Sequence, residues 1–176
     1  VLAGSLKWVK KHLNAGTDIN EQHRGELPLC IALARHRWDA ATLLLKKRPD
    51  VNKRQANHNA ALHDAAAAGA DNTVLKALLD LGADVNAIGC WRLTPLCWAA
   101  RGGHEDAVRF LIQNGADVGY RAKDGTGPVS VAVHQRHLDL ARFLIDSGAK
   151  CSLHHAVQCG HLAVARLLLS EGASVQ

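Results

Sequence analysis

The sequence contains no methionine, only four prolines and few aromatic side chains: four Trp, two Phe and one Tyr make up 4% of its 176 residues. A compact core of this size ordinarily packs more Phe and Tyr, so smaller side chains must organise the interior. Apolar runs such as Ala65–Ala68 and Leu167–Leu169 are too short to span a bilayer. Residues 1–9 do not have the pattern of a signal peptide. The missing methionine leads us to expect a processed or excised segment.

Cysteine usage indicates a reducing compartment. The five cysteines are odd in number and form no Cys-x-x-Cys pair, which argues against a secreted disulfide scaffold. We therefore expect free thiols and a cytoplasmic or nuclear location.

The positive charge is concentrated at one end of the chain. Residues 1–60 hold eleven Lys or Arg and five Asp or Glu, a net charge of +6, whereas residues 61–176 hold ten and eleven, a net charge of −1. This asymmetry is typical of a solvated basic face and would also suit an acidic partner. Nucleic-acid binding through residues 1–60 is the weaker alternative, because those charges come without an aromatic platform for stacking bases.

One pattern recurs along the whole chain at a spacing of 33 or 34 residues. Its clearest copy, LTPLCWAARGGH, occupies residues 93–104, and the place of Pro95 is held by Pro28, Ala61 and Pro128 at spacings of 33, 34 and 33. A second marker keeps the same phase. It reads GADVN at 82–86 and recurs, altered or shortened, at 15–20, 48–52, 115–118, 148–149 and 172–175. Two markers in one register predict an array of repeated units.

These motifs resemble the ankyrin repeat, whose period of about 33 residues and Thr-Pro-Leu-His signature they share. The resemblance covers essentially all 176 residues. It implies an all-α solenoid of about five to six stacked helix–turn–helix units with β-hairpin loops between them. It also implies that His63 and His154, at the histidine position of the signature, hydrogen-bond between adjacent loops.

Local sequence supports helix pairs in the unit at 87–119. Thr94 stands where a helix needs an N-cap, and Pro95 follows at the first helical position. Gly102 and Gly103 end this helix, and residues 107–112 carry apolar side chains at helical spacing.

We expect a single repeat domain over residues 1–176. Its units are a partial one at 1–20, full ones at 21–52, 53–86, 87–119 and 120–150, and a last one at 151–176. The last unit is anomalous, because Gly148 and Gly172 are 24 residues apart and about nine residues are missing where its hairpin belongs. Lys150 thus leads almost directly from one helix pair into the next.

Several turns depart from the pattern. Arg48-Pro49 replaces Gly-Ala after a second helix, and His36-Arg37 and Arg136-His137 replace the Gly-His step between helices. We expect the two inter-helix turns to be more strained or more polar, and Pro49 to end its helix without the left-handed glycine. Leu27 and Ala60 replace the capping threonine, which weakens each cap by about 1 kcal/mol.

Motifs for catalysis are absent: the sequence has no P-loop, dinucleotide fingerprint, nucleophile elbow or kinase signature. A nucleophile built from Cys97 with His63 or His104 would lack an orienting group and an activated thiolate. The cysteines and histidines of 151–159 have the helical spacing of metal ligands, but the repeat accounts for His154 and no fourth ligand is fixed. We predict a non-enzyme without cofactor or metal.

Binding is the remaining function. Stacked repeats present an extended concave surface, and in proteins that resemble this one the variable positions are hairpin tips and the exposed inner-helix face. The predicted partner-binding residues are Arg24, Trp91, Leu93, Trp98, Arg101, Lys123, Asp124, His134 and His155. Trp91 and Trp98 lead this group because Trp and Arg anchor interface hot spots. The alternative for Trp91 is a structural plug folded onto the neighbouring finger.

Two functions are compatible with these features. The first is a non-catalytic module that binds a partner protein or peptide on its concave face, as a monomer or part of a longer chain, with no membrane contact. The alternative is a regulatory or structural arm of a larger enzyme, channel or effector whose active domain lies outside this segment.

Overall fold

The computed structural model describes residues 18–149 together with residues 157, 162, 165, 166 and 169. Residues 18–149 form eight α-helices and one 3-10 helix: α2 (Pro28–Ala34), α3 (Trp38–Leu45), α4 (Ala61–Ala67), α5 (Asn72–Asp80), η1 (Cys90–Arg92), α6 (Pro95–Gly102), α7 (Glu105–Gln113), α8 (Pro128–His134) and α9 (Leu138–Asp146). The expected units at 1–20 and 151–176 fall almost entirely outside the described residues, as do His154 and the Lys150 junction.

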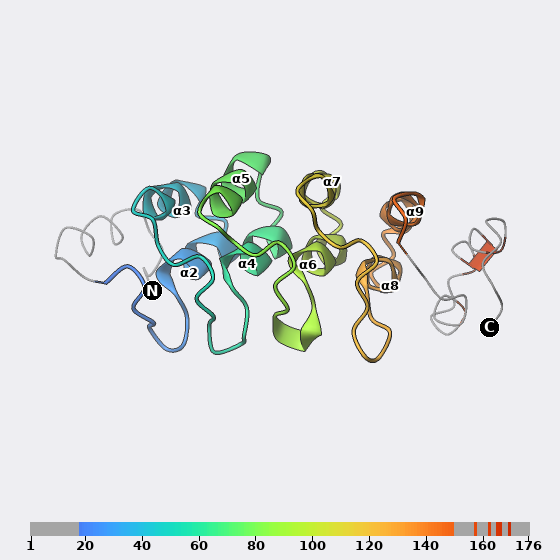
Figure 1. The fold of residues 1–176 in the computed structure, drawn as a ribbon, viewed down its shortest axis with the longest axis horizontal. Helices are drawn as coiled ribbons and strands as arrows, with labels where there is room; N and C mark the ends of the chain where they lie inside the picture. Colours follow the sequence, from blue (N-terminus) through green and yellow to red (C-terminus); the bar gives the residue numbers. More distant parts are fainter. Residues whose placement is uncertain (1–17, 150–156, 158–161, 163–164, 167–168, 170–176) are drawn as a thin grey trace.

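The helices form two layers that follow the sequence repeat (Figure 1). Helices α2, α4, α6 and α8 pack one against the next in an inner row, and α3, α5, α7 and α9 form the outer row. Each inner helix pairs with the outer helix that follows it, so the described residues contain four helix pairs. The predicted all-α repeat solenoid is therefore confirmed.

Small side chains build the core, as the low aromatic content predicts. Ala65, Ala66, Ala99 and Ala100 on the inner helices are all completely buried. Alanine lets neighbouring helix backbones approach closely, and leucines on both rows fill the space between the layers. A single pair is too thin to enclose a core, so each pair is stabilised by stacking on its neighbours.

The N-terminal caps of the inner helices agree with the local sequence. The Thr94 hydroxyl accepts a hydrogen bond from the Cys97 backbone N–H at 3.4 Å, which confirms the predicted cap of α6. Leu27 and Ala60 supply no side-chain cap to α2 and α4, also as predicted.

The backbone becomes left-handed just after every one of these eight α-helices. The residues with positive φ at these ends are, in chain order, His36, Arg48, Gly69, Gly82, Gly103, Gly115, Arg136 and Gly148. His36, Arg48 and Arg136 take φ values of 53°, 52° and 64°. A side chain in this conformation costs about 1–2 kcal/mol, so the strain expected at the two inter-helix turns is present, and Arg48 adopts the left-handed backbone in place of a glycine.

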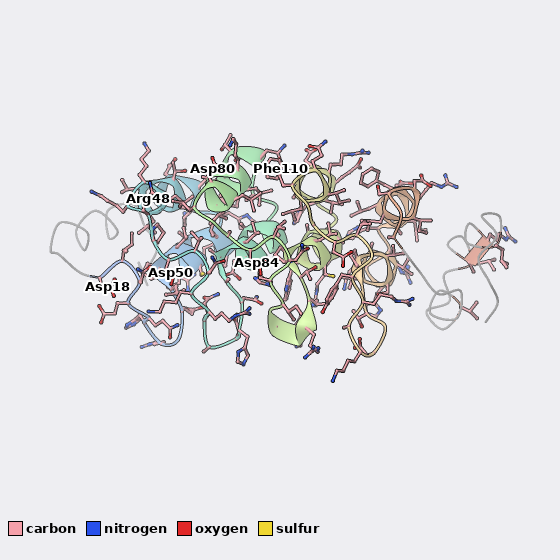
Figure 2. The ribbon with its side chains drawn as sticks, in the orientation of Figure 1. Asp18, Arg48, Asp50, Asp80, Asp84 and Phe110 are labelled. Atoms are coloured by element: carbon pink, nitrogen blue, oxygen red, sulfur yellow. The ribbon has the colours of Figure 1, made fainter. Side chains whose placement is uncertain are left out.

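Asparagines join consecutive units before three of the four described fingers, where a finger is the hairpin loop that leads to the next inner helix. The Asn52 Oδ1 atom accepts from the Asp84 N–H at 3.0 Å, and its Nδ2 atom donates to the Gly82 carbonyl at 2.7 Å. Asn86 makes the same two bonds to the next unit, at 2.7 and 3.0 Å. Figure 2 shows Asp18, Asp50 and Asp84, which mark these turns, following one another along the array.

The fingers are hairpins closed by one or two backbone bonds. The His23–Glu26 pair forms the one β-bridge assigned in the described part of the chain. In later fingers, Gly89 N–H donates to Leu93 O and Ala122 N–H donates to Thr126 O, at 2.9 and 2.8 Å. The predicted hairpin loops are thus present, but they are too short to form extended strands.

Candidate functional site

Two tryptophans stack at the third finger. Trp91 lies in η1 at the finger tip and Trp98 lies on α6, with ring centroids 5.4 Å apart and ring planes inclined by 24°. Arg101 follows one turn later on α6, and its guanidinium carbon lies 4.6 Å from the Trp91 centroid and 5.3 Å from the Trp98 centroid. We call Trp91, Trp98 and Arg101 the tryptophan–arginine cluster.

The guanidinium lies over both rings, at similar distances from each. Since the three separations are nearly equal, the groups form a triangle, whereas a guanidinium at the end of a stacked column would lie much farther from one ring. Trp98 and Arg101 are three residues apart on α6 and therefore share one helix face. Both rings attract the cation, which holds Arg101 in place by about 1 kcal/mol or more.

The backbone presents Trp91 outward at some energetic cost. Trp91 and Arg92 have φ values of 53° and 56°, a left-handed pair typical of a two-residue hairpin turn. Trp91 remains 63% exposed and stacks on Trp98 of its own unit. The structural-plug alternative, which required packing onto the neighbouring finger, does not describe this contact. Strained positions of this kind are concentrated at functional sites.

Leu93 corrects the predicted surface. It is only 4% exposed and packs with Cys97 and Val131, beneath Trp98 and Tyr120. The chain is extended at Leu93, with φ −92° and ψ 141°, so its side chain turns inward from the tip. Leu93 therefore supports the cluster from below and offers no surface to a partner.

The other predicted binding residues lie apart from the cluster. Arg24, Lys123 and Asp124 are exposed on finger tips, and His134 is exposed at the end of α8. The Asp124 carboxylate accepts a hydrogen bond from the Thr126 N–H at 2.9 Å, which shapes the fourth finger. His155 is outside the described residues. A binding role for these five residues stays a prediction.

The cluster is rich in hydrogen-bond donors that lack acceptors. The Trp98 Nε1–H is buried and has no hydrogen-bond partner among the described residues. In the same part of the chain, the Arg101 guanidinium contacts ring faces but makes no ion pair or hydrogen bond. A buried donor without an acceptor costs about 1–3 kcal/mol.

The unit before the cluster carries an acidic residue at the position that Trp98 holds in the third unit. Asp64 on α4 is the repeat equivalent of Trp98, and its Oδ2 accepts from Gln55 Nε2 at 2.7 Å. Burial raises the pKa of Asp64 to about 6, although hydrogen bonds from Cys30, Gln55 and Asn59 lower it. Asp64 is not among the binding residues predicted from sequence; the change from Asp to Trp at one repeat position was the available signal.

The histidine position of the signature is buried in all four described units. Its occupants are Cys30, His63, Cys97 and Ser130. The His63 ring accepts from the Ala60 N–H at 3.2 Å through Nδ1 and donates to the Ala87 carbonyl at 2.9 Å through Nε2. The inter-loop role expected for His63 is confirmed, and burial lowers its pKa.

Burial raises the pKa of the Cys97 thiol, the opposite of what an activated nucleophile requires.

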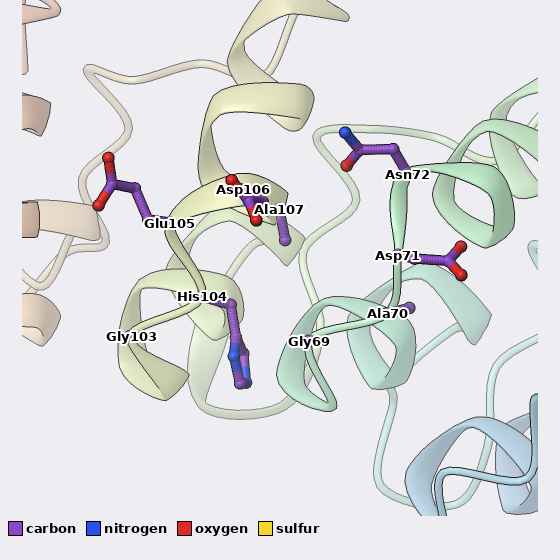
Figure 3. A pocket seen from close by; sticks show the side chains of 9 residues that line it. All are labelled: Gly69, Ala70, Asp71, Asn72, Gly103, His104, Glu105, Asp106 and Ala107. Atoms are coloured by element: carbon purple, nitrogen blue, oxygen red, sulfur yellow. The ribbon is translucent and has the colours of Figure 1, made fainter.

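A hollow away from the cluster lies between the helix turns of two units (Figure 3). It measures about 730 Å³ and is lined by residues 69–72 and 103–107. His104 crosses it and donates from Nε2 to the Ala67 carbonyl at 3.1 Å, while the Asp71 carboxylate caps α5. His104 thus joins the two units, and the Asp71 carboxylate is engaged within its own unit. Within the described residues, no three His, Cys, Asp or Glu side chains are grouped to hold a metal.

Comparison with known families agrees with the geometry. A family model described as ankyrin repeats in three copies matches residues 1–89 and 71–153, and a single ankyrin-repeat model matches 151–176. The chain belongs to the ankyrin-repeat family. A comparison with curated proteins found no significant match.

Family membership bears on function at a coarse level. Ankyrin repeats are generally protein–protein interaction modules and are typically not catalytic. No helix in the described part of this ankyrin-repeat protein is both long and apolar enough to cross a membrane.

Proposed function

We propose that this ankyrin-repeat protein binds a partner protein or peptide through the tryptophan–arginine cluster on its concave side. The observation that carries the proposal is Trp91, a large aromatic side chain 63% exposed on a left-handed backbone. Tryptophan and arginine are the residue types most enriched in interface hot spots. An exposed stack with an adjacent arginine is therefore a binding anchor by composition and by position.

Hydrogen bonds between fingers support the proposal, because they hold the surface in one shape. The Cys90 N–H donates to Asn59 Oδ1 at 2.9 Å, and the Tyr120 hydroxyl donates to the Arg92 carbonyl at 2.5 Å. The third finger is thus attached to both of its neighbours. A surface ordered before binding loses less conformational entropy when a partner docks.

The experiment begins with a random peptide library displayed on phage and selected on the immobilised chain. A selected peptide is then titrated against the wild type, Trp91→Ala and Leu138→Ala. Leu138 is the matched control, since it is 39% exposed but lies on the outer helix α9. We expect Trp91→Ala to weaken binding by about tenfold or more and Leu138→Ala to leave affinity unchanged.

Urea unfolding of the same three proteins separates binding from folding. Trp91→Ala removes the stack on Trp98 and one cation–π contact but no core packing, so it should still fold and be less stable than the wild type by about 1–2 kcal/mol. Selected peptides that bind Trp91→Ala and wild type equally would contradict the proposal.

The cysteines support a cytoplasmic or nuclear location, which we propose alongside the binding role. Cys30, Cys90 and Cys97, the cysteines in the described part of the chain, are free thiols. Free thiols of this number are typical of a reducing compartment.

A further inference from the structure

We infer that the segment bound at the tryptophan–arginine cluster is an acidic peptide, with a carboxylate on Arg101 and an adjacent apolar side chain against Trp91. The inference rests on the proposed function and adds the chemistry of the partner.

Unsatisfied donors are the first observation. The Arg101 guanidinium carbon lies 4.6 and 5.3 Å from the two ring centroids, and its N–H groups have no acceptor among the described residues. The neighbouring Trp98 Nε1–H also lacks an acceptor there, but it is buried, so Arg101 supplies the donors that a bound peptide can reach. A carboxylate supplies acceptor oxygens and matches the fork of guanidinium donors, forming charge-assisted bonds stronger than neutral ones.

The charge around the cluster is the second observation. The third and fourth fingers with Arg101 carry four cations, Arg92, Arg101, Arg121 and Lys123, against one acid, Asp124, a net charge of +3. Arg92, Arg121 and Lys123 are exposed, and the Tyr120–Arg92 hydrogen bond joins the two fingers. Exposed cations attract carboxylates that come within about one Debye length of them.

Arg101 itself disfavours a basic partner. The guanidinium lies near both rings, so a lysine or arginine of a partner that approached them would meet a positive charge already in place. A basic segment would therefore be repelled by Arg101. The cluster is therefore complementary to anions, although it contains two aromatic rings.

The position of Asp64 determines on which side of Arg101 the acidic residues of the bound peptide lie. This carboxyl group lies on α4, the inner helix packed against α6 on the side away from the fourth finger. An acidic peptide would be repelled there and attracted by Arg121 and Lys123. We therefore place its carboxylates over Arg101 and toward the third and fourth fingers.

An apolar contact completes the recognition. Trp91 is 63% exposed and Ile88 on the same finger is 41% exposed, the two most exposed large apolar side chains of residues 18–149. An apolar side chain next to the carboxylate would cover this surface, and the burial contributes about 25 cal/mol per Å².

The test uses peptides selected on the wild-type chain and one synthetic twin of each, in which Asp and Glu are replaced by Asn and Gln. We expect Asp and Glu to be enriched in the selected sequences and the amide twin to bind at least about tenfold more weakly. Arg101→Gln should bind both peptides with similar, weak affinity. Arg142→Gln, which removes an exposed cation from the outer helix α9, should preserve the difference.

Two further variants sharpen the result. Arg101→Lys keeps the charge but loses the planar fork, so its affinity for the acidic peptide should fall between wild type and Arg101→Gln. Asp64→Asn removes the nearby repulsion and should strengthen binding of the acidic peptide by a few-fold.

The outcomes separate the two proposals. Selected peptides that are neutral or basic and still require Trp91 would overturn the acidic partner and leave the binding role intact. The same holds if the amide twin binds as tightly as the acidic peptide. If selected peptides do not depend on Trp91, both proposals fail. Trp91-dependent binding of an oligothymidylate probe without any Trp91-dependent peptide would replace the peptide with nucleic acid.

Discussion

At the residue scale, His63 and Asp64 are neighbours that respond oppositely to acid. The folded state needs neutral His63, because its Nδ1 atom accepts a hydrogen bond, and burial lowers its pKa below the ordinary 6.5. The unfolded chain therefore takes up this proton first, and His63 reduces stability as the pH falls below 6.5. For Asp64 the folded pKa of about 6 lies above the ordinary 3.8, so its protonation favours the folded state as the pH falls through about 6.

Replacing Asp64 isolates its contribution. Near pH 7 the charged, partly buried carboxylate costs stability, so Asp64→Asn should be more stable than wild type by about 2 kcal/mol. This difference should shrink as the pH falls through about 6, where wild-type Asp64 takes up its proton. Urea unfolding of both proteins across this pH range measures it.

The control for this prediction is Asp39→Asn on α3, where the residue is exposed. That variant should stay within about 0.5 kcal/mol of wild type at each pH. A stability difference for Asp64→Asn that does not change with pH would show that burial does not raise the pKa of Asp64.

At the scale of single elements, the helix ends offer a reciprocal test of backbone strain. Arg48 ends α3 with φ 52°, at the position that Gly82, Gly115 and Gly148 occupy in later units. Arg48→Gly removes a side chain from a left-handed residue and should stabilise the fold by about 1 kcal/mol. Thermal or urea unfolding detects this change.

Gly82→Arg is the reverse substitution in the next unit. A Cβ atom at Gly82 would meet no heavy atom within 4 Å, so its cost comes from the backbone with φ +86° alone. We expect destabilisation by a similar amount, about 1 kcal/mol. Equal stability of both variants and wild type would mean that these ends carry no strain.

The asparagine connections between units stop at Gly119. This residue takes the place of Asn52 and Asn86, and its Cβ would contact only Asp117 Oδ1 at 3.3 Å. In Gly119→Asn the new amide can donate to the Gly148 carbonyl, as Asn86 does to Gly115. We expect this variant to exceed Gly119→Ala in stability by about 1 kcal/mol, the value of one such bond. Matching stabilities of the two variants would contradict the role given to these asparagines.

At the scale of the whole molecule, much of the fold follows from repeat phase. Two markers in one register predicted the units, and local chemistry predicted the Thr94 cap and the strained turns at His36 and Arg136. These features depend on short-range sequence, since caps and left-handed turns are decided by a few neighbouring residues.

The site was less predictable, because it depends on the conformation of one finger tip. The repeat pattern groups Trp91, Leu93, Trp98 and Arg101, but neighbouring residues of a hairpin face different sides. The left-handed turn at Trp91 sends this ring outward onto Trp98, and the extended backbone at Leu93 sends its side chain inward. A pattern of residue types does not specify which side of the hairpin each one takes.

Indole N–H resonances test the binding face most directly. The chain has four tryptophans, so a ¹⁵N-labelled sample gives one indole signal for each, assigned by single Trp→Phe variants. On titration with a selected acidic peptide, we expect the Trp91 and Trp98 signals to shift and that of Trp38, on the outer helix α3, to stay in place. Saturable peptide binding that leaves the Trp91 and Trp98 signals unmoved would contradict the assignment of the partner site to the tryptophan–arginine cluster.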